Sequence, residues 1–133
     1  MENLLDSKSI REQALMVALN KTAIVAETDI NGVITYANDK FLDISGFSRE
    51  ELIGQTHRIV NSGHHPKAFM EELWKTIKSG QVWRGEICNK SKTGKPYWVD
   101  TCIAPIYNEV GEIQKFIAIR FDITEKKILA EKL

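Results

Sequence analysis

The chain has 133 residues, of which 43% are hydrophobic, and its 18 basic and 18 acidic side chains cancel. This length indicates one domain with its own core, and the balanced charge argues against nucleic acid or an anionic membrane as a partner. No apolar stretch approaches the ~20 residues of a membrane span, and the N-terminus lacks the pattern of a signal peptide, so the sequence predicts a cytoplasmic protein.

A helix and a β-hairpin are the first predicted elements. Residues 10–19 place apolar side chains at helical spacing, which indicates an amphipathic helix, and we assign residues 1–20 to it. β-rich runs at 22–27 and 33–37 flank an Asn-Gly pair, which favours a tight hairpin turn because it supplies positive φ angles. The two runs are therefore expected to pair.

Helix-start signals mark the middle of the chain. Asn38 is a favoured capping residue, and Ser48 and Glu51 have the spacing of a capping box. Residues 56–65 show no periodicity and are predicted to form a loop. Pro66 then begins the longest internal helix, because proline is at home in a first turn.

Strands dominate the last third of the chain. Two of them are predicted within residues 81–105, around a Lys/Thr/Gly turn, and another spans 113–123. Trp83, Ile87 and Asn89 share the apolar face of the first of these strands, because strand side chains alternate. A buried amide needs a hydrogen-bond partner from the protein, water or a ligand, so this strand is expected to line a pocket.

The order of elements indicates the fold class. A helix, a hairpin, further helices and then three strands predict an α+β sheet with helices on one face. Residues 124–133 form the start of a charged linker helix at the C-terminal end. Cys88 and Cys102 lack the spacing of a zinc knuckle or a redox dithiol. No catalytic constellation is evident, so the sequence predicts a protein that is not an enzyme.

Several motifs together resemble a PAS domain. They are Asp29–Asn38, Phe47–Gly54, the hairpin from Trp83-Arg84-Gly85 to Tyr97-Trp98-Val99, and Asp122–Glu125. The resemblance implies a PAS fold over residues 21–123, with a five-stranded antiparallel sheet, short helices on one face, an N-terminal cap helix and a C-terminal signalling helix. It also implies a sensory module beside a kinase, chemoreceptor or cyclic-dinucleotide output module of a longer protein.

Within that family, the chain is most similar to the FAD-binding PAS domains of aerotaxis receptors and nitrogen-fixation regulators. This similarity implies bound FAD and the sensing of redox or oxygen state. The alternative is a PAS module without cofactor that dimerises and relays a signal, or one that senses an unidentified small ligand. Light-sensing LOV domains differ at key positions, because His57 stands where they carry the photoactive cysteine, and Val99 and Arg120 replace two flavin-facing amides.

The strand residues Trp83 and Asn89 are candidate cofactor contacts. Trp83 offers a broad π-face for a planar cofactor, or it is a core aromatic residue. Asn89 offers a donor and an acceptor to the pyrimidine edge of a flavin, or it binds loop backbone. Arg120 would stabilise negative charge on a reduced flavin, or it forms an ion pair with Asp100 or Asp122.

The loop residues His57, Arg58 and Asn61 are further candidates. By resemblance, this loop would contact the phosphates and adenosine of the dinucleotide, with Arg58 as the phosphate partner, and the alternative is a set of solvated side chains. His64 and His65 invite a haem or zinc interpretation. Two neighbouring histidines without a further ligand at suitable spacing argue against haem and against metal.

A homodimer is predicted from the outward sheet positions. Trp98, Cys88, Cys102 and Ala104 fall on that face and make it more apolar than a solvated sheet should be. The N-terminal helix is the expected cover, and its apolar stripe also suits a second copy. We therefore expect a parallel homodimer through the N-terminal helix and the outer sheet face.

Overall fold

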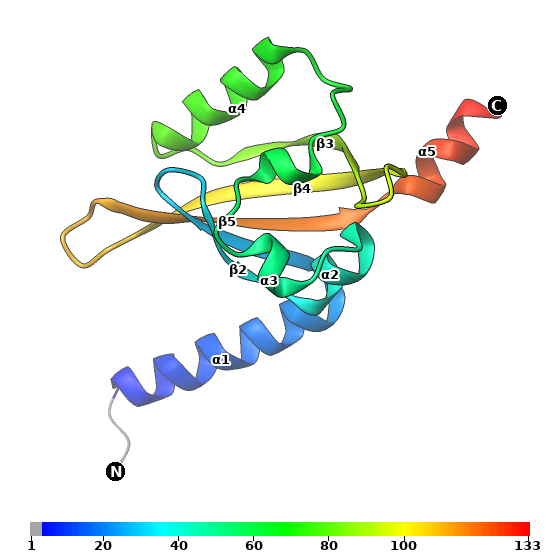
Figure 1. The fold of residues 1–133 in the computed structure, drawn as a ribbon. Coiled ribbons are helices and arrows are strands. Elements are labelled where there is room, and N and C mark those ends of the chain that lie inside the picture. The colour runs from blue at the N-terminus through cyan, green and yellow to red at the C-terminus, as the bar shows by residue number, and fades with distance from the viewer. Residues whose placement is uncertain (1–3) are drawn as a thin grey trace.

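The computed structural model describes residues 4–133, with side chains from Ser9 onward. Figure 1 shows one sheet with the helices α2, α3 and α4 on one face, while α1 and α5 extend away from it. The helices are α1 (Leu4–Thr22), α2 (Asp39–Ser45), α3 (Arg49–Leu52), the 3₁₀ turn η1 (His57–Val60), α4 (Lys67–Lys78) and α5 (Thr124–Glu131). The strands are β1 (Ile24–Asp29), β2 (Ile34–Ala37), β3 (Trp83–Lys90), β4 (Pro96–Tyr107) and β5 (Ile113–Asp122).

The sheet has five antiparallel strands in the order β2-β1-β5-β4-β3. This architecture confirms the predicted α+β PAS fold with helices on one face. Register pairs Ile24 with Arg120, Arg120 with Thr101, and Thr101 with Gly85, so these residues form one row across the sheet. Arg120 therefore lies on the central strand, on the face that the helices cover.

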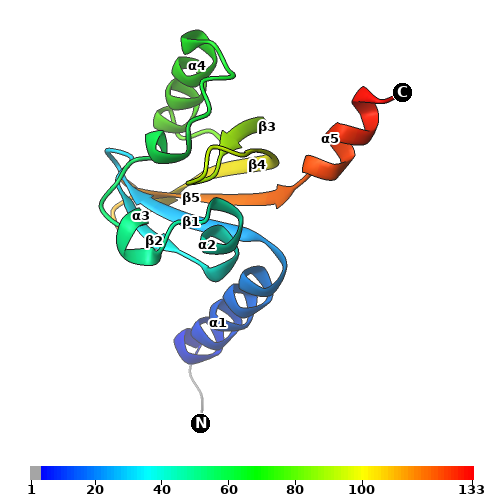
Figure 2. The same ribbon diagram turned by 45° about the vertical axis from the view of Figure 1, so that its right-hand side comes forward.

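The core lies between the sheet and these helices. Leu73 and Ile77 of α4 are buried with Phe41 of α2, as the apolar stripe of α4 predicts. The opposite face of β5 is more open than its continuous apolar sequence suggested. Ile117 and Ile119 are only half-buried there, because no helix packs over that side of β5 in the described chain. Figure 2 shows α2, α3 and α4 on the other face.

The predicted capping signals are confirmed. The Asn38 side-chain oxygen accepts hydrogen bonds from the backbone N–H of Phe41 in α2 and of Val25 in β1. Ser48 and Glu51 form the reciprocal capping box at the start of α3. Asn38 thus ties a helix start to an inner strand, which a sequence pattern alone does not reveal.

The hairpin between β1 and β2 forms, but its turn is not the tight Asn-Gly type that the sequence suggested. Within this turn only Gly32 has a positive φ, at 86°, whereas Asn31 does not. The Asp29 carboxylate instead accepts hydrogen bonds from the backbone N–H of Asn31 and Val33 and so holds a wider loop. The Trp74 ring packs so closely against Gly32 that a Cβ there would lie 2.6 Å from it. Gly32 is therefore required both by conformation and by the approach of α4.

The N-terminal helix differs from the prediction. In Figures 1 and 2, α1 points away from the sheet rather than lying across its outer face. Its apolar side chains are spread around the helix, because Leu15 lies on a different side from Ile10 and Val17 at 100° per residue. All three are more than half exposed, at 58%, 56% and 57% respectively. The helix is therefore neither clearly amphipathic nor a cap in the single chain.

Residues 56–65 contain more order than the predicted loop. Thr56 caps η1, and the following residues run along the edge of β3. This packing buries Cys88, for which an outward position was predicted.

No helix among residues 4–133 is long and apolar enough to cross a membrane.

Candidate ligand cavity

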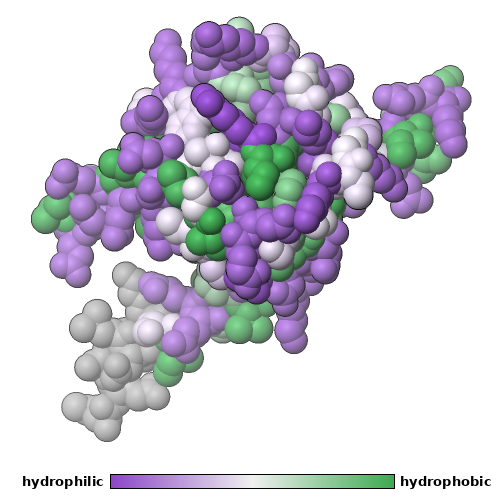
Figure 3. All heavy atoms as spheres, viewed as in Figure 1, coloured by the Kyte–Doolittle hydropathy of each residue, from purple (hydrophilic) through white to green (hydrophobic). Residues whose placement is uncertain are grey.

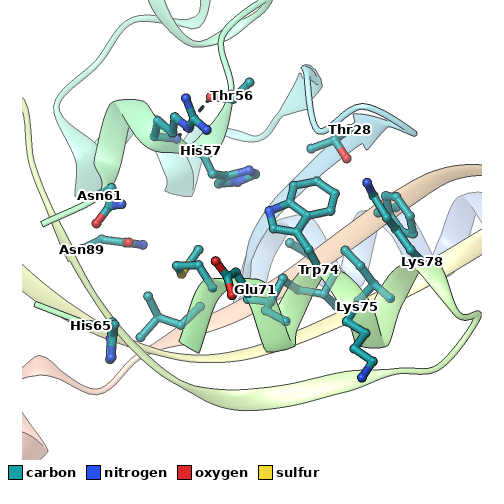
Figure 4. Close-up of a pocket in the computed structure, with 18 of the residues that line it drawn as sticks. Thr28, Thr56, His57, Asn61, His65, Glu71, Trp74, Lys75, Lys78 and Asn89 are labelled. Carbon is teal, nitrogen blue, oxygen red and sulfur yellow. Dashed lines mark hydrogen bonds between the residues drawn. The ribbon is translucent and has the colours of Figure 1, made fainter. Parts of the chain in front are cut away.

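A cavity of about 780 Å³ lies between α4, η1 and the inner face of the sheet (Figure 4). Its volume is within the range of about 300–1,000 Å³ that is usual for small-molecule sites. The apolar part of its wall is made by Met70, Leu73, Trp74, Ile77, Ile87, Ile103, Phe116 and Ala118. In Figure 3 apolar residues are visible between α4 and the helices below it, framed by hydrophilic ones.

Buried polar atoms without partners are gathered at the sheet side of this cavity. They are His57 Nε2, Tyr97 Oη, and Nε and Nη1 of Arg120, which have no hydrogen-bond partner among the described residues. His57 and Arg120 line the cavity, and Tyr97 is paired with the cavity residue Asn89 across the β3–β4 ladder. Buried polar groups are normally satisfied, so this cluster is suited to a polar ligand.

The charge at this end of the cavity is positive. Burial lowers the pKa of Arg120 to about 10, so its guanidinium still carries a charge at neutral pH. Burial, and then the charge of Arg120, lower the pKa of His57 well below its usual value, so that imidazole is neutral. Burial raises the pKa of Tyr97 to about 12, so its hydroxyl keeps its proton. The cluster therefore favours a ligand with a negative charge or with acceptor atoms.

The alternative reading of Arg120 as an ion-pair residue is wrong. Asp100 lies on the outer face, where its carboxylate is 3.9 Å from Arg84, and Asp122 accepts hydrogen bonds from Thr124. The Arg120 guanidinium faces Phe41 instead, 5.8 Å from the ring centroid. Strand alternation places Arg120 on the inner face and Asp100 on the outer face, whereas Asp122 shares a side of β5 with Arg120 but is engaged by Thr124 at the end of the strand.

The rim of the cavity is largely basic. The exposed Arg58 of η1 and the exposed lysines Lys67, Lys75 and Lys78 of α4 contribute to it. Among the described lining residues, Glu71 supplies the one carboxylate. A ligand that extends from the buried end to the rim would therefore meet positive charge at both places.

Five of the six residues predicted for the site line this cavity: His57, Arg58, Asn61, Asn89 and Arg120. They come from η1 and the residue after it, from β3 and from β5. The fold therefore brings together positions that are far apart in the chain. The Asn61 carboxamide is partly engaged, because its oxygen accepts a hydrogen bond from the N–H of Gly63. Asn89 is 7% exposed and faces the cavity as the strand alternation predicted.

Trp83 does not line the cavity. Its ring folds over Gly85, where a Cβ would lie 2.6 Å from it, and packs edge-on against Phe69 at 5.5 Å between centroids. The space above Gly85 is therefore filled by the ring of Trp83. This packing agrees with the alternative that Trp83 is a core aromatic residue. Its position gives no support to a contact with the ligand.

Further residues around the cavity were not indicated by the sequence patterns. Trp74 on α4 and Thr28 on β1 both line it, and Tyr97 on β4 belongs to its buried polar cluster. Trp74 belongs to the apolar stripe of its helix, so its pattern is that of a core residue. Tyr97 could have been found from its pairing opposite Asn89, because cross-strand partners share a face.

The neighbouring histidines are engaged in contacts within the protein. His65 Nε2 already accepts a hydrogen bond from the backbone N–H of Cys88, at 2.9 Å. In the described part of the chain, no cluster of three or more His, Cys, Asp or Glu side chains is placed to bind a metal ion. Both cysteines are free thiols.

The fold and this cavity define a class of protein that sequence comparison also supports. A family model described as a PAS domain matches residues 21–125, and the chain belongs to that family. PAS domains are sensory modules of signalling proteins, and the predicted resemblance is confirmed.

The chain is 38% identical over 109 residues to the aerotaxis receptor of Escherichia coli (strain K12), which covers 82% of this chain and 21% of the receptor. It is 34% identical over 109 residues to a nitrogen fixation regulatory protein of Klebsiella pneumoniae, covering 82% of this chain and 22% of that protein. It thus spans about a fifth of the length of these relatives. A solved PAS domain from Colwellia psychrerythraea has a TM-score of 0.76 and 26% identity, over 87% of this chain and 98% of that one.

Proposed function

We propose that this PAS domain binds FAD and reports redox or oxygen state to an output domain that follows it in a longer cytoplasmic protein. The observation that carries the proposal is the buried Arg120, which lacks a hydrogen-bond partner among the described residues and lies beside neutral His57, in a cavity whose wall includes a large apolar part. The similarity to the aerotaxis receptor and to the nitrogen fixation regulatory protein supports the choice of a redox ligand. The chain itself is proposed to sense rather than to catalyse.

The chain's own residues suit the parts of this ligand. A bound flavin would supply the ability to accept and release electrons. Asn89 offers a donor and an acceptor to the polar edge of the ring, and Arg120 stabilises the negative charge that the ring gains on reduction. The basic rim of Arg58 and the α4 lysines suits the phosphates. Trp74 adds an aromatic wall between these two ends.

A short path leads from the cavity to the C-terminal helix. Arg120 and Asp122 lie near the end of β5, and the Asp122 carboxylate accepts hydrogen bonds from the backbone N–H and the hydroxyl of Thr124, where α5 begins. The Thr124 hydroxyl also accepts a hydrogen bond from the N–H of Trp98 on β4. We propose that a change of charge beside Arg120 shifts the end of β5 and, through Thr124, the direction of α5.

The purified protein is expected to be yellow and to release FAD when it is denatured. The measurement is an absorption spectrum of protein from a flavin-replete host, followed by chromatography of the released cofactor. FAD close to one per chain supports the proposal, and FMN or riboflavin would correct the ligand. Colourless protein that also fails to take up added FAD would favour the alternative, a PAS module that relays signals without a cofactor or senses another small ligand.

We further propose that the domain forms a parallel homodimer through α1 and the outer sheet face. The exposed Ile10, Leu15 and Val17 of α1, and Phe121 of β5, which is 49% exposed, leave apolar surface uncovered in the single chain. Deleting residues 1–19 should convert the dimer to a monomer or to aggregates, as measured by light scattering at several concentrations. Asn20 stays in this variant, so its hydrogen bond to Asn38 is kept.

A matched variant separates loss of the helix from loss of its apolar surface. Ile10→Glu combined with Val17→Glu keeps α1 but makes its surface charged, and it should also give monomers. A dimer that persists in both variants would exclude α1 from the interface, although the family assignment would be unaffected.

A further inference from the structure

The loop from Asn61 to His65, which we call the edge loop, covers the free edge of β3. Because β3 is the last strand of the sheet, one side of its backbone has no partner strand. The edge loop takes that place at Cys88. The Ser62 hydroxyl donates to the Cys88 carbonyl at 2.6 Å, and His65 Nε2 accepts from the Cys88 N–H at 2.9 Å.

The edge loop also borders the ligand cavity. Asn61 forms an isolated antiparallel bridge with Asn89, and both residues line the cavity together with His65. Figure 4 shows Asn61 and Asn89 close together, with His65 on the same side of the cavity. Any movement of the edge loop away from β3 therefore changes the end of the cavity that Asn89 forms.

His65 is held in place by aromatic contacts. Its ring stacks on Phe69 with centroids 4.1 Å apart and planes 12° apart. Its edge contacts are to His64 at 4.9 Å and Trp98 at 5.9 Å. Because Nε2 accepts a hydrogen bond, the ring proton must be on Nδ1 and the imidazole must be neutral.

We propose that His65 is an acid-sensitive positioning residue, whose neutral ring holds the edge loop on β3 and whose protonation releases the loop and opens the Asn89 end of the cavity. Protonation at Nε2 replaces the acceptor with a second donor, which faces the Cys88 N–H. The hydrogen bond is then lost and two N–H groups oppose each other. The proposal rests on the proposed function only where it concerns the ligand.

Burial and the neighbouring His64 oppose a positive charge on His65. Burial, and then the charge of His64, lower the pKa of His65. The ionisable groups on the elements packed next to it are His64 in the edge loop, Lys67 and Glu71 on α4, Cys88 and Glu86 on β3, and Lys127 on α5. Lys127 Nζ lies 4.4 Å from the centroid of the Trp98 ring and is paired with Glu86 at 2.7 Å.

The sign of the pH effect follows from this direction. A histidine whose pKa is lowered on folding contributes its full stabilisation above the unfolded value of about 6.5. That contribution is lost as the pH falls through 6.5 to the lowered value in the folded protein, because the unfolded or opened chain binds the proton more tightly. Acid therefore favours the released edge loop.

The experiment is amide hydrogen exchange of Cys88 by NMR in the ligand-free domain, together with the ¹⁵N shift of His65 Nε2, between pH 7.5 and 5. In the unmodified protein, the protection factor of Cys88 should fall by about tenfold or more in step with the His65 titration, which corresponds to losing one hydrogen bond. His65→Gln, whose side chain does not titrate, should remove this pH dependence. His64→Gln is the matched control and should keep it.

Two results would overturn the proposal. One is a Cys88 protection factor that stays constant between pH 7.5 and 5 in the unmodified protein. This result can be interpreted without any variant. The other is a pH dependence that persists unchanged in His65→Gln or disappears in His64→Gln.

Dissociation of FAD then tests the connection with the cavity. The release rate of FAD should rise on acidification in the unmodified protein and in His64→Gln, but not in His65→Gln. Equal acid release from all three proteins would show that the edge loop does not control the cavity. If the domain binds no FAD at all, the proposed function fails, whereas the Cys88 measurement still decides the role of His65.

Discussion

Replacing Arg120 with methionine should stabilise the ligand-free domain and at the same time make the bound flavin harder to reduce. Arg120 is 4% exposed, and Nε and Nη1 of its guanidinium have no partner among the described residues, so this buried charge lowers the stability of the fold. Replacing buried ionic groups with apolar ones of similar size often gains about 1–4 kcal/mol. Thermal unfolding of the ligand-free variant should therefore begin at a temperature several degrees higher.

The same substitution should lower the midpoint potential of the proposed flavin. Arg120 interacts more strongly with a reduced, negatively charged ring than with an oxidised one. A differential stabilisation of about 1–3 kcal/mol corresponds to a midpoint potential about 20–65 mV more negative in Arg120→Met. Spectroelectrochemical titration measures this shift. Arg120→Lys keeps the charge and should retain much of the original potential.

Arg84→Met is the matched control for these measurements, because Arg84 is an exposed arginine on the outer face of β3. It should leave both the potential and the stability nearly unchanged. If Arg120→Met lowered the stability of the ligand-free domain and left the potential unaltered, Arg120 would be a structural residue rather than a ligand contact.

Asn89→Ala should weaken flavin retention while leaving the fold intact. The amide is buried at the cavity wall, and loss of one buried hydrogen-bonding partner costs about 1–3 kcal/mol, or about 5–150-fold in affinity. Fluorescence titration with FAD measures the affinity, and thermal unfolding followed by circular dichroism checks the fold.

Lys90→Ala is the control for Asn89→Ala. Lys90 is the next residue of β3 and is exposed, because its side chain points away from the cavity. It should bind FAD like the unmodified domain. Full flavin occupancy in Asn89→Ala would remove Asn89 from the site and would leave Arg120 and His57 as the candidates at the buried end.

Local sequence rules were sufficient for features that depend on near neighbours in the chain. Asn38 and the Ser48–Glu51 pair act as caps because the groups that they bind include N–H groups within three residues. Alternation along β3 places Asn89 on the same face as the buried Ile87, and alternation along β5 places Arg120 on the same face as the buried Phe116 and Ala118. These rules, with the family resemblance, predicted the sheet correctly, and five of the residues that they selected line the cavity.

Other features depended on contacts between distant segments, which local patterns do not contain. The Trp83 ring fills the space above Gly85, and Trp74 reaches the cavity only because α4 packs over the β1–β2 turn at Gly32. The outward course of α1 is a further case, because its spread of apolar residues gives no preferred face toward the sheet.

The chemistry of the cavity is decided at this tertiary level as well. The sequence by itself determined that Arg120 and His57 are present and that Arg120 faces inward. Only the folded arrangement decided that Arg120 has no ion-pair partner among the described residues and that burial near this cation keeps His57 neutral. The pKa and hydrogen-bonding capacity of a buried group depend on the atoms that surround it, and here these atoms come from strands and helices far apart in the chain.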